Sequence, residues 1–449
     1  MAKYSEKAYP IDKITHPVQK FIQHEKAGGL ALGLSVIVAM FLANSAWSDE
    51  YFSLLGHKFG FTVDGKSYLE FSILHWINDG LMSVFFFVVG LELKREIVGG
   101  ELSNLRKAIL PIGAAIGGMA IPALIYLIFN PSGEAQNGWG IPMATDIAFA
   151  LGILVLIGKK VPLALKVFLT ALAIVDDLGA VLVIALFYTS EISLQNLALG
   201  VFIAGVMYGA NRLGVRNMFF YAILGILGVW IAFLLSGVHA TIASVIAAFT
   251  IPADVRIKEG LYISQLKEYI KRFKNIDPND DIPTLKSAQL HILDEIKKNT
   301  NKAIPPLQRL EHAMHPFVVF FIIPIFALAN AGISLDINVD KLFATNIAIG
   351  IAVGLIGGKV LGITGATYLL VKLKIATLPK GMNLKNIIGL SFLAGIGFTM
   401  SLFITSLAFT NPEYVEQAKI GIFTASILSG IVGYFILKSD KSQLSKSSV

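Results

Sequence analysis

Long runs of mostly apolar residues recur from end to end of this chain, and no other feature restricts its fold as strongly. A run of about twenty such residues can cross the hydrocarbon core of a bilayer as an α-helix. Only 15% of the 449 residues are charged, whereas soluble domains average about 25%. The sequence therefore predicts an all-α, polytopic membrane protein rather than a soluble protein with one anchor.

Twelve transmembrane spans can be placed on the sequence. They cover residues 27–45, 72–92, 108–129, 141–158, 167–187, 193–210, 217–235, 237–251, 316–332, 343–371, 386–409 and 417–437. Twelve is an even number, so both chain ends are expected on one side of the membrane. Alternate loops are basic, and the loops 131–138, 189–193 and 411–416 between them carry no lysine or arginine. By the positive-inside rule both termini are predicted to be cytoplasmic, and the net charge of +7 then does not indicate nucleic acid.

The spans form one predicted transmembrane domain, residues 27–437, between a cytoplasmic segment 1–26 and a cytoplasmic tail 438–449. No small-residue cleavage site follows the first apolar run, so that run is expected to be a retained helix. Residues 253–310 form a charged cytoplasmic insertion with two helical apolar patterns, which predicts a helical hairpin. A solvated insertion without a role in transport is the alternative. Residues 47–70 predict a short β-hairpin over the outer face.

The most unusual residues of the spans are two adjacent carboxylates, Asp176 and Asp177, near the centre of span 167–187. Each charged aspartate at the bilayer centre costs about 2.5–3.5 kcal/mol on insertion scales. A proton or ion pathway is the usual reason for that cost. The alternative is that one aspartate only caps or pairs with a neighbouring helix. The chain has no cysteine, which excludes disulfides and thiolate metal sites.

Two spans are interrupted by residues that do not favour a continuous helix. Span 141–158 contains Pro142 followed by small and polar residues, and span 386–409 contains Gly395 and Gly397 with hydroxyl side chains. Interrupted spans in corresponding places of two halves indicate a transporter binding site. The half-helix ends would face each other near the midplane, where a carboxylate offsets N-terminal charge and an ammonium offsets C-terminal charge.

Two charged residues inside the apolar spans fit these roles. Asp146, with Thr145 as a cap, matches the first, and Lys359 inside span 343–371 matches the second; snorkelling to the interface is the alternative for the lysine. Glycines four residues apart in the third and tenth spans predict close contact between helices. They are Gly113, Gly117, Gly350, Gly354 and Gly358.

Taken together, these motifs resemble the NhaA-type sodium/proton antiporters. The matching stretches are residues 144–152, 161–166, 171–180, 236–241, 309–312, 326–332 and 395–401. The resemblance extends from about residue 25 to 435, although the insertion is longer than the loop usual in that family. It implies twelve helices with inverted-topology repeats, in which the interrupted fourth and eleventh spans cross at the midplane.

The resemblance also implies roles for individual residues. Asp177 corresponds to the principal cation-binding carboxylate, and Asp176 lies beside it and pairs with Lys359. Asp146 and Thr145 correspond to the residues that offset the partial charges at the ends of the interrupted helices.

A second set corresponds to the cytoplasmic pH-sensing cluster of the family: Glu92, Arg95, Glu96, Glu311 and His312. Ordinary charge at the ends of helices is the alternative for this set. Asp79 resembles a polar residue near the outer end of the second span. His239, within an apolar stretch, is interpreted as a packed, hydrogen-bonded histidine.

The expected function is exchange of cytoplasmic Na⁺ or Li⁺ for external H⁺ across the cell inner membrane, for sodium and pH homeostasis. Hard cations prefer oxygen ligands, so Na⁺ is expected at Asp177 and Asp176. Burial raises the pKa of a carboxylic acid from about 3.9, so protons can compete for such a site near neutrality. No cofactor is expected, and the family suggests electrogenic, pH-regulated transport by a homodimer held partly by the outer hairpin. The preference among Na⁺, Li⁺ and K⁺ stays open.

Three other classes fit less well. An intramembrane aspartyl protease could use Asp146 with Asp177, but Lys359 and the second interrupted helix would then have no purpose. A channel does not need a saturable site at which protons compete, and a scaffold would not retain midplane charges. The chain is therefore predicted to be a transporter and not an enzyme.

Overall fold

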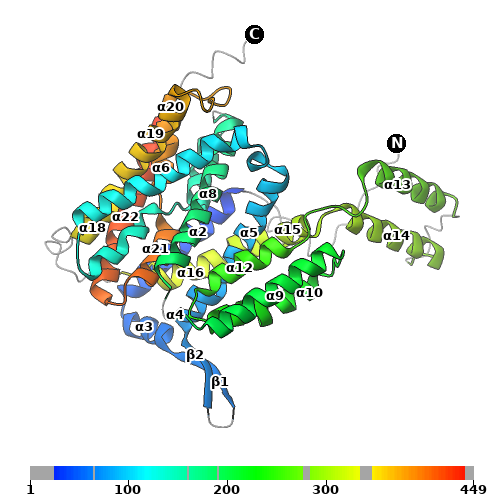
Figure 1. The fold of residues 1–449 in the computed structure, drawn as a ribbon, viewed down its shortest axis with the longest axis horizontal. Helices are drawn as coiled ribbons and strands as arrows, with labels where there is room; N and C mark the ends of the chain where they lie inside the picture. Colours follow the sequence, from blue (N-terminus) through cyan, green and yellow to red (C-terminus); the bar gives the residue numbers. More distant parts are fainter. Residues whose placement is uncertain are drawn as a thin grey trace.

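The computed structural model describes residues 25–63, 66–158, 161–189, 192–276, 284–333 and 346–439, with side chains omitted for 25–26 and 61–68. These residues form an all-helical body with one β-hairpin (Figure 1). The helices of the body are α2 (Glu25–Ala43), α4 (Ile73–His75), α5 (Met82–Gly99), α6 (Leu105–Phe129), α7 (Ile147–Ile157), α8 (Leu163–Phe187), α9 (Leu194–Arg212), α10 (Met218–Ile223), α11 (Ile231–Leu234), α12 (Ala240–Thr250), α15 (Pro306–Phe317), α16 (Ile323–Asn330), α18 (Asn346–Val353), α19 (Lys359–Lys372), α20 (Leu384–Ala394), α21 (Phe398–Ala408) and α22 (Pro412–Lys438).

Short segments of other helical geometry join several of these helices. Four are π-helical turns inside longer spans, and one is a 3-10 helix that precedes α7. They are η1 (Trp76–Leu81), η5 (Leu224–Trp230), η6 (Val318–Ile322), η7 (Gly354–Gly358) and the 3-10 segment η3 (Glu134–Met143). Such turns are frequent at functional sites.

Seven helices of the described chain are long and apolar enough to cross a membrane, or up to nine if each of two bent pairs counts as one span. The seven are Ile73–Gly99, Leu105–Phe129, Glu134–Ile157, Leu163–Phe187, Pro306–Asn330, Asn346–Lys372 and Pro412–Lys438. The bent pairs are Ala27–Ala43 with Ser48–Gly56 and Leu384–Ala394 with Phe398–Ala408. The other predicted spans are helical over Leu194–Arg212, Met218–Leu234 and Ala240–Thr250, but these helices do not meet both requirements. A count of twelve therefore remains a prediction.

Two helices extend well beyond the predicted spans. The second span is predicted to end at residue 92, but α5 continues to Gly99. The ninth span is predicted to begin at residue 316, but α15 begins at Pro306. Charged residues such as glutamate, lysine and arginine form helices readily, so a loss of apolar character marks the edge of the hydrocarbon and not the end of the helix. The predicted polar cluster consequently lies on rigid helices and not in loops.

The glycine pattern in the third and tenth spans predicted a close helix contact, and α6 and α19 pack against each other along their length. A Cβ atom added to Gly117 would collide with the carbonyl oxygen of Gly362, and one added to Gly358 would lie 2.7 Å from the Cα of Pro122. The backbones touch because these positions have no side chain. The close approach positions Lys359, which lies between Gly358 and Gly362.

Two extensions leave the body (Figure 1). Strands β1 (Lys58–Val63) and β2 (Lys66–Ser72) pair in antiparallel fashion, with Phe59 opposite Phe71, as the β-hairpin prediction required. The helix α3 (Ser48–Gly56) that precedes them was not predicted. The charged insertion forms α13 (Glu259–Lys274) and α14 (Ser287–Ala303), which pack against each other.

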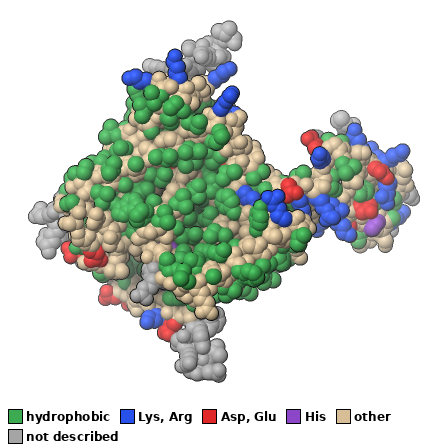
Figure 2. Space-filling model, viewed as in Figure 1, with side chains coloured by type: hydrophobic (Ala, Val, Ile, Leu, Met, Phe, Trp, Pro, Cys, Tyr) green, Lys and Arg blue, Asp and Glu red, His purple; other side chains and the backbone are tan. Residues whose placement is uncertain are grey.

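The surface of the body is mostly apolar in the view of Figure 2. Lysine and arginine side chains gather at the end of the body near α20 and around the base of the α13–α14 hairpin. An apolar belt with basic residues at one margin is typical of a protein that lies in a bilayer.

Candidate functional site

Helix α8 carries the two adjacent aspartates through the middle of the body (Figure 1). Its 25 residues give a length of about 37 Å, and Asp176 and Asp177 lie near its midpoint. Asp176 is 1% exposed and Asp177 is 2% exposed. Consecutive residues of a helix point about 100° apart, so the two carboxylates meet different neighbours.

Asp176 meets the buried lysine of the tenth span. The Nζ atom of Lys359 donates to Oδ2 of Asp176 at 2.6 Å and to Oγ1 of Thr145 at 2.9 Å. Lys359 is completely buried and begins α19 directly after the π-helical turn η7. The predicted alternative of snorkelling is therefore wrong, since the ammonium group does not reach an interface.

The carboxylates also have oxygen atoms without a partner. Oδ1 of Asp176 and Oδ1 of Asp177 are buried and accept no hydrogen bond. A buried acceptor without a donor is costly, and such an oxygen can accept a proton or coordinate a hard cation. Within the described residues no group of three or more Asp, Glu or His side chains could hold a metal ion, so any cation would rely on one or two carboxylates with hydroxyl or carbonyl oxygens.

The two interrupted spans meet beside these carboxylates. The first break is the extended segment 144–146 between η3 and α7, and the second is 395–397 between α20 and α21. The amide of Asp146 donates to the carbonyl of Ile396 at 2.6 Å, and the hydroxyl of Thr145 donates to the carbonyl of Ala394 at 2.8 Å. Backbone groups that have no partner within their own helix are thus hydrogen-bonded in part by the other interrupted span. An irregular backbone at membrane depth requires such partners.

Asp146 caps two helices with one carboxylate. Its Oδ1 accepts from the amide of Phe149 in the first turn of α7 at 3.1 Å. Its Oδ2 accepts from the amide of Thr399 at 3.0 Å and from the Thr399 hydroxyl at 2.5 Å, at the start of α21. A negative charge is favourable at a helix N-terminus, and here it faces two of them. The sequence predicted a compensating role for Asp146 but not the second helix.

Two further hydroxyl residues of α21 take part in the crossing. Thr399 bonds Asp146, and the hydroxyl of Ser401 donates to the carbonyl of Ile141 in η3 at 2.8 Å. Sequence reasoning noted hydroxyl side chains in this interrupted span but assigned them no partner. In the sequence, only their position within an interrupted span indicates a role, because their partners lie about 250 residues away along the chain.

The second predicted cluster lies on α5 and α15. Arg95 makes ion pairs with Glu96, at 3.0 Å, and with the buried carboxylate of Glu311. Glu92 interacts electrostatically with these three residues. The structure thus brings four of the five predicted residues together, with Arg95 among the three glutamates.

The fifth predicted residue, His312, is exposed and lies within electrostatic reach of Glu311. Glu92 also interacts electrostatically with Asp177, which links this cluster to the paired aspartates. The structure adds a neighbour that sequence reasoning missed: Lys94, which donates to the carbonyls of Phe249 and Ile251 at the C-terminal end of α12. A cation at that end of a helix is favourable.

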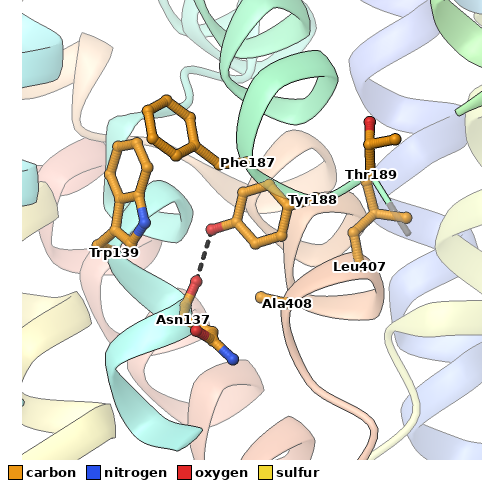
Figure 3. Close-up of a pocket in the computed structure, with 7 residues that line it drawn as sticks. All are labelled: Asn137, Trp139, Phe187, Tyr188, Thr189, Leu407 and Ala408. Atoms are coloured by element: carbon orange, nitrogen blue, oxygen red, sulfur yellow. Dashed lines mark hydrogen bonds between the residues drawn. The ribbon is translucent and has the colours of Figure 1, made fainter. Parts of the chain in front are cut away.

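In η1, Oδ2 of Asp79 lies 3.0 Å from Nε2 of His75 in an ion-pair geometry. His239 is hydrogen-bonded to the carbonyl of Tyr188 at 2.7 Å, in line with its interpretation as a packed histidine. Tyr188 also lines a cavity of about 210 Å³, where its hydroxyl points at the carbonyl of Asn137, 2.6 Å away (Figure 3). None of the lining residues is a carboxylate: they are Asn137, Trp139, Phe187, Tyr188, Thr189, Leu407 and Ala408.

Comparisons with known proteins agree over almost the whole chain. The family described as "Na+/H+ antiporter 1" matches residues 19–437. A Wolinella succinogenes protein called "Na(+)/H(+) antiporter NhaA" is 48% identical over 417 residues, which are 93% of this chain and 92% of the relative. Another of the same name from Oleidesulfovibrio alaskensis is 48% identical over 430 residues, 96% of this chain and 95% of the relative.

Proposed function

Because this chain belongs to the NhaA family of Na⁺/H⁺ antiporters, we propose that it exchanges cytoplasmic Na⁺ or Li⁺ for external H⁺ across the cell inner membrane. Members of this family are multi-pass membrane transporters that need no cofactor, and not enzymes. The exchange serves sodium and pH homeostasis, and the transported ions are the substrates. The family supports Na⁺/H⁺ exchange by this chain, and the geometry around the paired aspartates supports the residues that we propose for it.

One observation carries the assignment of the site. Asp177 is buried beside an aspartate–lysine pair and has an oxygen atom without a hydrogen-bond donor. A proton and Na⁺ compete for this carboxylate, since each neutralises its charge and both cannot bind it at once. Release of the proton on one side and of the cation on the other gives exchange without another energy source. Asp176 lies next to it and supplies further oxygen ligands for the cation.

Electrogenic transport requires that more protons than cations move in a cycle. The contact between Lys359 and Asp176 supplies the additional proton when the pair separates and one partner titrates. Thr145 holds the ammonium in its resting position through its hydroxyl group. Either the ammonium group of Lys359 or the carboxyl group of Asp176 can carry the second proton, because both members of the 2.6 Å pair are titratable groups.

The arrangement of the chain in the membrane follows the family pattern. Twelve spans form two inverted-topology repeats, and the interrupted fourth and eleventh spans cross at the midplane. The mutual hydrogen bonds of Asp146 with Ile396 and of Thr145 with Ala394 support the crossing. Residues 27–437 are the transport domain, and the segments 1–26, 253–310 and 438–449 are cytoplasmic, which the basic end of the body supports (Figure 2).

Two further properties belong to this proposal. The cluster around Arg95 regulates transport by pH, supported by its ion pairs and by the electrostatic link from Glu92 to Asp177. The β1–β2 hairpin contributes to a homodimer on the outer side, supported by its projection beyond the helical body (Figure 1).

Everted membrane vesicles test the proposal. After the vesicles are energised, an internal pH dye should recover when Na⁺ or Li⁺ is added to wild-type vesicles and should not recover with Asp177→Asn. Glu101→Gln, on the exposed surface, is the matched control and should behave like the wild type. Recovery with K⁺ alone would overturn the selectivity, and recovery with Asp177→Asn would overturn the site.

A further inference from the structure

The α13–α14 hairpin carries polar groups at its centre and exposed apolar groups on its surface. Asn299 of α14 donates to Gln265 at 3.1 Å and to the hydroxyl of Tyr269 at 2.8 Å, and Tyr262 contacts Thr300 at 3.0 Å. These contacts fix which faces of the two helices meet. The outward sides of the helices therefore follow from the helical repeat.

One edge of the hairpin is identified by an ion pair, in which Arg272 of α13 lies 3.3 Å from Glu295 of α14. Residues about half a turn away from these two lie on the opposite edge. On α13 they are Ile263, Lys267, Ile270 and Lys274, and on α14 they are Leu290, Leu293 and Lys297. We call this set the apolar–basic edge.

The composition of the apolar–basic edge suits one kind of partner. Its four aliphatic side chains are 40–53% exposed, and three lysines lie among them. Glu259, in the first turn of α13, is the one acidic residue on this side of its helix, Asp294 lies at the border, and Glu268 and Glu295 lie on the other edge. Aliphatic side chains flanked by lysines are the pattern of helices that lie in a membrane interface and bind acidic lipids.

The chain joins this hairpin closely to the membrane spans. Only residues 304–305 separate α14 from α15, which begins the span Pro306–Asn330. The segment before α13 is hydrogen-bonded to the end of α14 and the start of α15. The amide of Arg256 donates to the carbonyl of Lys302 at 3.0 Å, and the amide of Leu307 donates to the carbonyl of Pro252 at 3.1 Å. A hairpin joined to a membrane span by two residues is tethered within reach of the headgroups of the surrounding bilayer.

We propose that the α13–α14 hairpin docks through its apolar–basic edge onto the acidic headgroups of the bilayer that surrounds the protein. The aliphatic residues enter the interface, and Lys267, Lys274 and Lys297 contact the headgroup phosphates. This docking is independent of the transported ion, and neither the Na⁺ site nor the pH-sensing cluster takes part in it.

The test uses the full-length protein reconstituted in vesicles of phosphatidylcholine alone or of an equal mixture with phosphatidylglycerol. The chain has no cysteine, so one introduced cysteine carries the only environment-sensitive fluorophore. Ile263→Cys places it on the proposed edge. Leu261→Cys is the matched control, because Leu261 is also an exposed aliphatic residue of α13 but points about 200° away.

The emission of the label at residue 263 should shift to the blue, and its quenching by iodide should fall, only in the vesicles with phosphatidylglycerol. The label at residue 261 should respond to neither lipid. Choline chloride at about 1 M, where the Debye length is ~3 Å, should reverse the shift at residue 263.

Substitutions separate the edge from general charge. Lys267→Gln/Lys274→Gln/Lys297→Gln should remove the shift, whereas Lys271→Gln/Lys298→Gln/Lys302→Gln loses the same charge elsewhere on the hairpin and should retain it. Equal shifts in both lipids, or equal responses of the two labels, would overturn the proposal. A shift in detergent that grows with protein concentration would also overturn it, in favour of contact with a second copy of the chain.

Discussion

Lys359 and Asp176 form an ion pair of 2.6 Å whose side chains are 0% and 1% exposed. The lysine comes from α19 and the aspartate from α8, 183 residues apart in sequence. Removing one partner of a buried pair leaves an uncompensated charge, which is far more costly than removing both. The pair therefore has a measurable signature in stability as well as in transport.

We expect Lys359→Met and Asp176→Asn each to lower the free energy of unfolding by about 3–5 kcal/mol. The double variant should lose less than the sum of the single losses, since no buried charge is left alone. Unfolding of the purified proteins in detergent measures all four corners of this double-mutant cycle. Strictly additive losses would show that the two charges do not interact.

Asp146 caps α7 and α21 together, so its loss should exceed that of a single cap. Loss of one N-cap costs about 1 kcal/mol, which predicts about 2 kcal/mol for Asp146→Ala. Asn104→Ala removes a single exposed cap, in which Oδ1 of Asn104 accepts from the amide of Arg106, and is the matched comparison. Equal losses for the two variants in the same unfolding assay would contradict the double cap.

The contact of α6 with α19 predicts opposite effects for two glycines of one helix. Gly362→Ala would push against the carbonyl of Gly117, with a loss of about 1–3 kcal/mol for overpacking. It should also lower antiport, because Lys359 lies one turn away. Gly365 has no heavy atom within 4 Å of an added Cβ, so Gly365→Ala should stabilise the helix by about 0.5–1 kcal/mol. A neutral Gly362→Ala in both assays would argue against the close approach.

Arg95 is the only cation of the predicted pH-sensing set that pairs with both Glu96 and Glu311 in the described structure. Arg95→Gln should move the pH dependence of antiport to more alkaline pH, since the carboxyl group of Glu311 loses its paired cation and then gives up its proton less readily. Lys107→Gln, which breaks an exposed 3.7 Å pair with Glu101, is the control and should leave the profile unchanged. Dye recovery in everted vesicles between about pH 6 and 9 measures both, and an unshifted profile for Arg95→Gln would contradict the regulatory role.

The sequence predicted the parts of this molecule that are set by the cost of burial. A lysine or a pair of aspartates inside an apolar span has few physical explanations, so the sequence alone singles out Asp176, Asp177 and Lys359. The same holds for Gly117 and Gly358, whose spacing predicts helix contact.

Other features depend on partners that lie far away in sequence. The bond from Thr399 to Asp146 follows only when the two interrupted spans are known to touch, and no local pattern encodes that crossing. Lys94 looked like one more charge at the end of a span, yet it binds the last carbonyls of α12. The end of α5 at Gly99 was missed because hydropathy reports the hydrocarbon edge, while the helix continues into the polar region.

Competition between Na⁺ and a proton for Asp177 is the basis of the proposed exchange. Calorimetric titration of the purified protein with NaCl, repeated in two buffers of different ionisation enthalpy, counts the protons released as Na⁺ binds. We expect saturable binding with at least one proton released, weaker apparent binding as the pH falls, and no binding to Asp177→Asn. Glu101→Gln should bind like the wild type. Na⁺ binding without proton release at any pH, or unchanged binding to a folded Asp177→Asn protein, would contradict it.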